Sequence, residues 1–132
     1  MKIGLFELAS RYLMPSLRRR LVEILYREHG FTQQEISEML GLSQPAVSKY
    51  LSGSRGFYLD VSIINEVEES VKHLASLIAI GRLKGYSLEL ELARIVISML
   101  GRGYACQLHA KLDTTITPYE CGVCKKLFFK IS

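Results

Sequence analysis

The stretch TQQEISEMLGLSQPAVSKYLSG, residues 32–53, decides the fold and predicts two short helices joined by a tight turn. Thr32 is suited to cap the first helix, with Glu35 three residues later as its reciprocal partner. Gly41 is expected to end that helix at a positive φ, which costs glycine little. Ser43 is expected to cap the second helix, and the proline two positions on fits a first helical turn.

The second helix is expected to bury one apolar stripe and to expose a polar strip. The stripe comprises Ala46, Val47, Tyr50 and Leu51, and the strip comprises Ser43, Gln44, Ser48, Lys49 and Ser52. The strip contains no acidic residue, although solvated helix faces usually carry both charges. Hydroxyls, an amide and a cation can hydrogen-bond base edges in a major groove, and Gln suits adenine. The strip therefore predicts a DNA-reading surface; the alternative is an ordinary helical hairpin with a polar exterior.

The same stretch resembles the helix-turn-helix of lambda-repressor/Cro-like regulators. More narrowly, residues 7–56, ELASRYLMPSLRRRLVEILYREHGFTQQEISEMLGLSQPAVSKYLSGSRG, are similar to a group of predicted archaeal transcriptional regulators. Members of that group open with an aromatic-hydrophobic-Pro helix and close the DNA-binding unit with a YLSG-x-RG string. The resemblance implies that the first residues of the second helix contact bases, which here are Ser43, Gln44, Pro45, Ser48 and Lys49.

Further contacts to the DNA backbone are expected at both ends of the reading helix, as is common for this kind of hairpin. Arg55 lies just beyond its C-terminal end, close to Ser52, and is a candidate phosphate ligand. Gln33 lies near the first N–H groups of its own helix, and a helix N-terminus attracts phosphate. The run Arg18, Arg19 and Arg20 either lines phosphates or forms a solvated basic face.

Length and composition describe a globular chain of one domain or two small ones. The chain has 132 residues, of which 48% are hydrophobic and 23% charged, and its formal net charge is +4. The positive excess lies in residues 1–56 and 87–132 and suits phosphate contact there. No apolar run approaches the ~20 residues that span a bilayer, and no signal peptide is visible. A cytoplasmic protein without membrane contact is therefore expected.

Outside the central stretch, the chain reads as further helices. Residues 5–14 and 16–29 are expected to be helical, with a kink or restart at Pro15. A longer helix follows Asp60, and Ser87 is expected to cap a strongly apolar helix that ends at Gly101. A heptad seam runs along the helix after Asp60 and comprises Ile64, Val67, Val71, Leu74 and Ile78. Such a seam needs a partner helix, either within the chain as core or in a second copy as a dimer interface.

The last thirty residues change character and contain all three cysteines. Cys106-x2-His109 is followed, after eleven residues, by Cys121-x2-Cys124. Four such ligands in two pairs suit a tetrahedral zinc site, and an iron–sulfur centre is a second alternative. The third alternative is that His109 is a surface residue and that the cysteines are free or form one local bond. An odd number of cysteines makes a disulfide framework improbable.

Together these features predict a mainly α protein in three regions. Residues 1–56 form a helix-turn-helix DNA-binding domain, residues 57–101 a helical dimerisation region, and residues 102–132 a small irregular tail that binds metal. The predicted function is a sequence-specific transcriptional regulator that binds double-stranded DNA as a homodimer on an inverted repeat. The alternatives are a helical protein-interaction module and a thiol or metal redox protein that uses the C-terminal Cys-x-x-Cys. No catalytic constellation is visible, so an enzyme is not expected.

Overall fold

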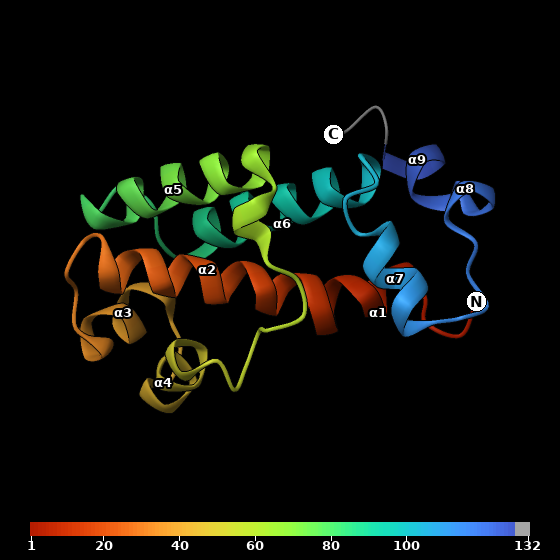
Figure 1. Cartoon of the computed structure of the whole chain (residues 1–132). Helices are drawn as coiled ribbons and strands as arrows, with labels where there is room; N and C mark the ends of the chain where they lie inside the picture. Colours follow the sequence, from red (N-terminus) through yellow and green to blue (C-terminus); the bar gives the residue numbers. More distant parts are fainter. Residues whose placement is uncertain (129–132) are drawn as a thin grey trace.

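The computed structural model describes residues 1–128, so the last four residues of the predicted tail lie outside the described part. Every regular element in residues 1–128 is helical. The chain opens with α1 (Leu5–Leu8), a π-helical segment (Ala9–Leu13) and α2 (Met14–Arg27), which follow one another without a break (Figure 1). No helix of the described residues is both long and apolar enough to cross a membrane.

The π-helical segment takes the place of the kink that was predicted at Pro15. A proline within a helix clashes with the carbonyl four residues before it and cannot donate to it. The wider turn Ala9–Leu13 lies directly before α2, which begins at Met14 and has Pro15 in its first turn. The hydroxyl of Ser16 donates to the carbonyl of Tyr12 at 2.7 Å. Local widening thus lets the chain continue through Pro15 as a single rod.

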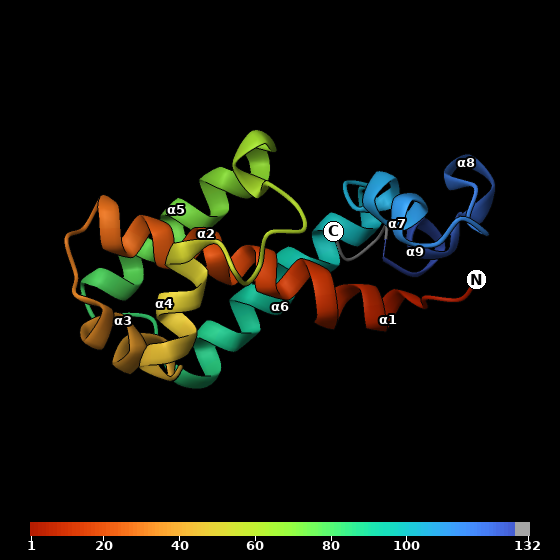
Figure 2. The same cartoon turned by 60° about the horizontal axis from the view of Figure 1, so that its bottom comes forward.

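Helix α2 is the centre of the molecule. On one side it carries the hairpin of α3 (Gln33–Leu40) and α4 (Gln44–Ser52), and on the other it packs against α5 (Asn65–Ala79) (Figures 1 and 2). Its fully buried side chains are Leu17, Leu21, Val22, Ile24 and Leu25. A loop with the short 3-10 turn Val61–Ile63 joins the hairpin to α5, and Asp60 caps that turn instead of a long helix.

The heptad seam of α5 lies in the interior of the single chain. Val67, Val71, Leu74 and Ile78 are at most 4% exposed, and Ile64 is half-buried against the same core. Their cover comes from α2 and from α6 (Gly85–Gly101), which begins two residues before the expected cap Ser87. Of the two alternatives for the seam, the structure has the internal one. Its placement as a dimer interface was wrong, because a second copy cannot reach these side chains.

The small tail, predicted to be irregular, consists of three short helices joined by turns. They are α7 (Cys106–Leu112), α8 (Pro118–Cys121) and α9 (Val123–Phe128). Helix α9 packs on α6, and α7 lies beside the start of the chain (Figure 1). A single cluster of buried apolar side chains runs from Leu8 in α1 to Ala105 at the start of α7, so all three predicted regions contribute to one core.

Candidate nucleic-acid interface

The α3–α4 hairpin is fixed by caps at both of its helices. Thr32 Oγ1 accepts from the Glu35 amide at 3.1 Å, and Glu35 Oε1 accepts from the Thr32 amide at 2.9 Å, which completes the predicted capping box. Gly41 ends α3 with φ 66°, in the left-handed region. Ser43 Oγ then accepts from the Ala46 amide at 3.2 Å and caps α4. The turn therefore has the geometry that its sequence predicted.

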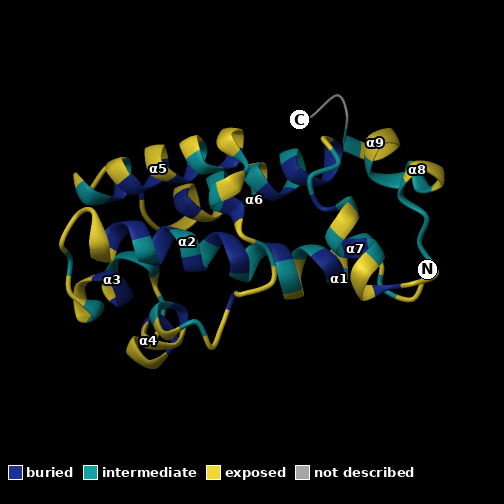
Figure 3. Ribbon diagram, in the orientation of Figure 1, coloured by how far each residue is buried: buried dark blue, intermediate teal, exposed yellow. Residues whose placement is uncertain are grey.

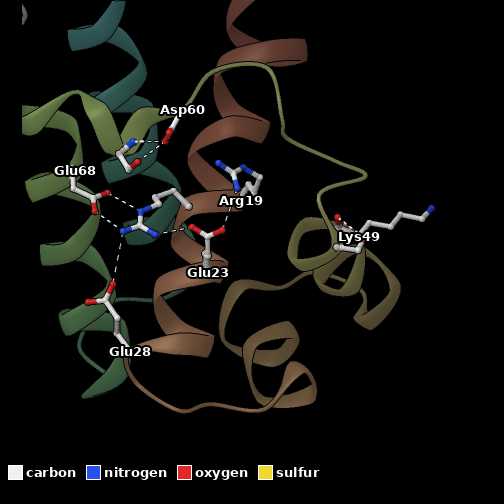
Figure 4. A network of polar contacts seen from close by, with 9 residues as sticks. Arg19, Glu23, Glu28, Lys49, Asp60 and Glu68 are labelled. Atoms are coloured by element: carbon white, nitrogen blue, oxygen red, sulfur yellow. Dashed lines mark hydrogen bonds and ion pairs between the residues drawn. The ribbon is translucent and has the colours of Figure 1, made fainter.

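Helix α4 buries one side and turns the other to solvent. Ala46, Val47 and Tyr50 are buried, and Leu51 is half-buried. The exposed residues are Ser43, Gln44, Pro45, Ser48, Lys49 and Ser52, so the predicted polar strip faces outward (Figure 3). The Lys49 side chain extends away from the body of the protein (Figure 4). This strip forms a convex edge whose only charged side chain is a cation.

The remaining predicted contact residues differ in how available they are. Arg55 is exposed beyond the end of α4, with its guanidinium carbon 5.9 Å from the centre of the Tyr50 ring. Gln33 is half-buried at the first residue of α3. The Ser52 hydroxyl lies 3.2 Å from the Lys49 carbonyl and 3.0 Å from the Ser54 hydroxyl. Ser52 is therefore engaged within its own helix end, whereas Arg55 is open to a ligand.

The loop after α4 is held by three contacts that sequence reasoning missed, two with α2 and one with the π-helical segment before it. Gly56 approaches α2 closely enough that a Cβ there would lie 2.5 Å from the Pro15 carbonyl oxygen. The Arg19 guanidinium lies over the Phe57 ring at 4.4 Å. The rings of Tyr12 and Tyr58 meet edge to face at 4.9 Å. These contacts fix the C-terminal end of α4 relative to the rest of the molecule.

Comparison with known protein families gives a match at this part of the chain. Residues 23–57 match a family model described as helix-turn-helix. The chain carries a helix-turn-helix domain. The match spans the end of α2, both hairpin helices and the loop that follows, which is about a quarter of the 132 residues. No curated protein and no solved structure matches the chain. The resemblance to lambda-repressor/Cro-like regulators is supported at this level, and the narrower archaeal group stays a prediction.

Two residues of the arginine run, Arg19 and Arg20, form ion pairs inside the protein. Both predictions for them, phosphate ligands and a solvated basic face, were therefore wrong. Arg19 is 8% exposed and pairs with Glu23 at 3.1 Å. Arg20 donates to both oxygens of Glu68 at 2.8 and 2.5 Å and to Glu23 at 2.6 Å (Figure 4). The spacing of Glu23 after the two arginines was the available signal, because residues three and four apart are neighbours on a helix.

Arg20 and Glu68 join α2 to α5. The hydrogen bonds that Arg20 donates to Glu68 raise the pKa of Arg20 above its ordinary value, and burial opposes this only in part. Both side chains are largely buried, with 16% and 13% exposed. A planar guanidinium that holds both oxygens of one carboxylate is geometrically more specific than a single ion pair. The pair therefore sets the position of α2, on which the helix-turn-helix domain is built.

The predicted metal ligands converge on one place in the tail. Cys106, Cys121, Cys124 and His109 line the same pocket of about 90 Å³ between α7 and the turn from α8 to α9. Within residues 1–128, no three His, Cys, Asp or Glu side chains are arranged to hold a metal ion. Burial raises the pKa of the Cys106 and Cys124 thiols, which disfavours thiol exchange through them. Zinc binding, and iron–sulfur as its alternative, stay predictions.

His109 and Asp113 of α7 instead hold the N-terminal segment. His109 is buried and its Nε2 lies 2.6 Å from the Ile3 carbonyl oxygen, to which it donates because a carbonyl only accepts. Asp113 Oδ2 accepts from the amides of Lys2 and Ile3 at 2.5 and 2.8 Å. These bonds, together with those from Thr115, hold the pKa of Asp113 well below its usual range. The alternative of a surface His109 was thus also wrong.

Proposed function

We propose that this protein is a sequence-specific DNA-binding regulator of transcription that inserts α4 into the major groove of duplex DNA. The observation that carries the proposal is the outward face of α4, which combines small hydroxyls, an amide and one cation and lacks acids. A B-DNA major groove admits a helix, and every base pair presents a distinct donor and acceptor pattern there. The helix-turn-helix match at residues 23–57 supports the same function.

Each exposed side chain of α4 has a chemically suitable partner in that groove. Gln44, in the first turn, can make two hydrogen bonds to adenine, one to N6 and one to N7. Lys49 can donate to guanine or to a phosphate, and Ser43 and Ser48 can serve either base edges or the backbone. Arg55, beyond the helix end, is placed to meet phosphate.

The rigid position of α4 supports sequence-specific recognition of DNA in preference to non-specific electrostatic binding. The caps at Thr32 and Ser43 and the packed loop at Gly56 hold α4 from both ends. Contacts that are pre-positioned lose less conformational entropy when they bind. We further propose that the protein acts as a homodimer, whose two reading helices lie about one DNA turn, ~34 Å, apart on an inverted repeat.

The test is a binding titration of the full chain against specific and scrambled duplexes at several salt concentrations. The variants are Lys49→Ala and Gln44→Ala, with Lys111→Ala and Gln107→Ala on α7 as exposed controls of the same residue types. Gln44→Ala is expected to lose about 1–3 kcal/mol of discrimination at one base pair. Lys49→Ala is expected either to do the same or to weaken all duplexes and reduce the salt slope by about one.

The controls separate the proposed surface from general positive charge. Lys111→Ala and Gln107→Ala are expected to bind as the unaltered protein does, because α7 lies far from α4 in the fold (Figure 1). If all four variants bound alike, α4 would not be the reading helix. If the unaltered protein showed no salt-dependent affinity for any duplex, the proposal would be abandoned in favour of a protein-interaction module.

A further inference from the structure

Helix α6 is apolar on two faces; within residues 1–128 one of them lies in the core and the other is exposed or half-buried. Its buried side chains are Leu88, Leu92, Val96, Met99 and Leu100. On the opposite face Tyr86 is 98% exposed and Leu90 is 52% exposed. Ala93 and Ile97 continue that line and are half-buried. The four outer residues are spaced by four, three and four, which is the repeat of a helix that packs along another helix.

A hollow beside this line extends the apolar surface onto α1. It has a volume of about 580 Å³, and its apolar lining includes Phe6, Ala9 and Met14 on one side and Ala93 and Ile97 of α6 on the other. Phe128 of α9 also lines it, and Ser10, Arg18 and Glu89 contribute polar groups. Phe6 is 76% exposed at its rim. We call the line Tyr86, Leu90, Ala93 and Ile97 together with Phe6 the outer face of α6. Contiguous exposed apolar surfaces of this kind mark interaction sites more often than isolated apolar residues do.

The charges along the outer face have opposite signs on its two edges. Glu89 lies on the edge toward α2, where its carboxylate is 3.8 Å from Arg18. Arg94 lies on the edge toward α5, where it lines a second hollow with Glu66 and His73. Both side chains remain mainly exposed, at 61% and 67%, and the ion pair of Arg94 within α6 is long, at 3.6 Å. Both charges are therefore open to a partner outside the chain.

The spacing of the two charges identifies that partner. When two parallel helices pair through a heptad seam, a residue at position g of one helix faces the residue at position e of the next heptad on the other helix, five positions later. Glu89 and Arg94 are five positions apart and stand at those two places around the seam. Side-by-side parallel copies of α6 would therefore set each Glu89 against the other copy's Arg94. An antiparallel pair would instead bring the two Arg94 side chains together near its centre, which is unfavourable.

We infer that a second copy of this chain packs on the outer face of α6, with the two α6 helices parallel about a two-fold axis. The arrangement is self-complementary, as a two-fold interface must be. It names the surface for the homodimer proposed above, after the seam of α5 proved to be internal. The inference rests on α6 and Phe6 and does not depend on whether α4 reads DNA.

The first test measures self-association of the full chain by sedimentation equilibrium in the absence of DNA. Leu90→Glu is expected to raise the dimer dissociation constant at least about tenfold, because a charge replaces an apolar side chain at the centre of the face. Ile80→Glu is the matched control, since Ile80 is 66% exposed at the end of α5, outside the outer face. The control is expected to associate as the unaltered chain does.

The second test exchanges the two charges, whose side chains lie on the surface. Glu89→Arg and Arg94→Glu are each expected to weaken the dimer, because each places like charges opposite one another. The double variant is expected to restore it. Failure of the double variant to recover would overturn the parallel arrangement. If the unaltered chain has the far-ultraviolet circular dichroism of a folded helical protein and yet stays monomeric at all concentrations, the inference is overturned. The outer face of α6 would then bind a different protein. Neither result would bear on DNA binding by a monomer.

Discussion

Gly56 shows how one residue fixes the loop that follows the reading helix. Its φ is +76°, in the region that costs other residues about 1–2 kcal/mol. A Cβ at this position would also lie 2.5 Å from the Pro15 carbonyl oxygen and 2.9 Å from Arg19 Cβ. Both of those atoms belong to α2, which has no room to move because its opposite side is buried against α5. Glycine is required here for conformation and for space.

Gly56→Ala is therefore expected to destabilise the protein by more than the conformational cost alone, about 2–4 kcal/mol in total. Gly81→Ala is the matched control, because Gly81 has the same φ of +76° and nothing within 4 Å of the position of a Cβ. The control is expected to lose only about 1–2 kcal/mol. Urea unfolding of the two variants measures the difference. Equal losses would show that the close approach of Gly56 to Pro15 is unimportant.

At the residue scale, the sequence allows good prediction where partners are local. Thr32 with Glu35, Gly41 and Ser43 all have the conformations and bonds that were expected, because a cap acts within four residues. Arg20 could not be placed in this way. Its partner Glu68 is 48 residues away, and only the packing of α5 on α2 brings the two together.

At the scale of elements, the Arg20–Glu68 pair holds α2 and α5 in one register. Glu68→Gln would remove the negative charge and one of the two accepting oxygens, so the largely buried Arg20 guanidinium would keep Glu23 but lose its bidentate partner. Loss of one partner from a buried ion pair destabilises a protein more than loss of an exposed pair. We expect Glu68→Gln to lower the free energy of unfolding by about 1–3 kcal/mol. Glu7→Gln is the control, since the Glu7–Arg11 pair is exposed and long at 3.5 Å. Its loss should stay within about 0.5 kcal/mol.

Thermal unfolding of the two glutamine variants provides the comparison, and a double-mutant cycle with Arg20→Gln isolates the coupling. A coupling near zero between residues 20 and 68 would contradict a locking role for the pair. Because α2 supports both α3 and α4, a weakened register is also expected to lower affinity for DNA without altering which base pairs are preferred. Gln44→Ala is expected instead to alter the preference at one base pair.

Helix periodicity predicted which faces are apolar but not what covers them. The spacing of Val67, Val71 and Leu74 is the same whether the partner is α2 or a second chain, and the structure shows it to be α2. The apolar nature of α6 was also visible, but a stripe alone does not tell an inner face from an outer one. The helical tail was not foreseen either, because its short helices depend on contact with α6 and with the N-terminus.

At the scale of the whole molecule, the start of the chain and α7 are tied together. Asp113 accepts bonds from the amides of Lys2 and Ile3, and His109 donates to the Ile3 carbonyl. This clamp keeps α1, with Phe6, alongside the C-terminal half of α6. The N-terminal residues therefore belong to the same structural unit as the outer face of α6, although more than one hundred residues separate Ile3 from Asp113.

The clamp is expected to make stability depend on pH in the acid range. The pKa of Asp113 in the folded protein is below its ordinary value of 3.8, so its carboxylate stabilises the fold above that pH. This contribution should be constant from neutral pH to about pH 5 and should be lost as pH falls further towards the folded pKa. Asp113→Asn is expected to lower the stability at neutral pH, and its difference from the unaltered protein should shrink as the pH falls below about 4.

Asp60→Asn is the matched control, because the pKa of Asp60 is also lowered, through bonds to Ser62 two residues away. Both variants remove a carboxylate with a depressed pKa, but only Asp113 holds a distant segment. Urea unfolding between pH 3 and 7 measures the stabilities, and amide hydrogen exchange at Lys2 and Ile3 reports the clamp directly. Faster exchange at these two amides is expected in Asp113→Asn and not in Asp60→Asn, because only the first substitution replaces their charged acceptor by a neutral, weaker one. Equal protection in both variants would mean that α7 does not hold the N-terminal segment, and the position of Phe6 on the outer face would then need another cause.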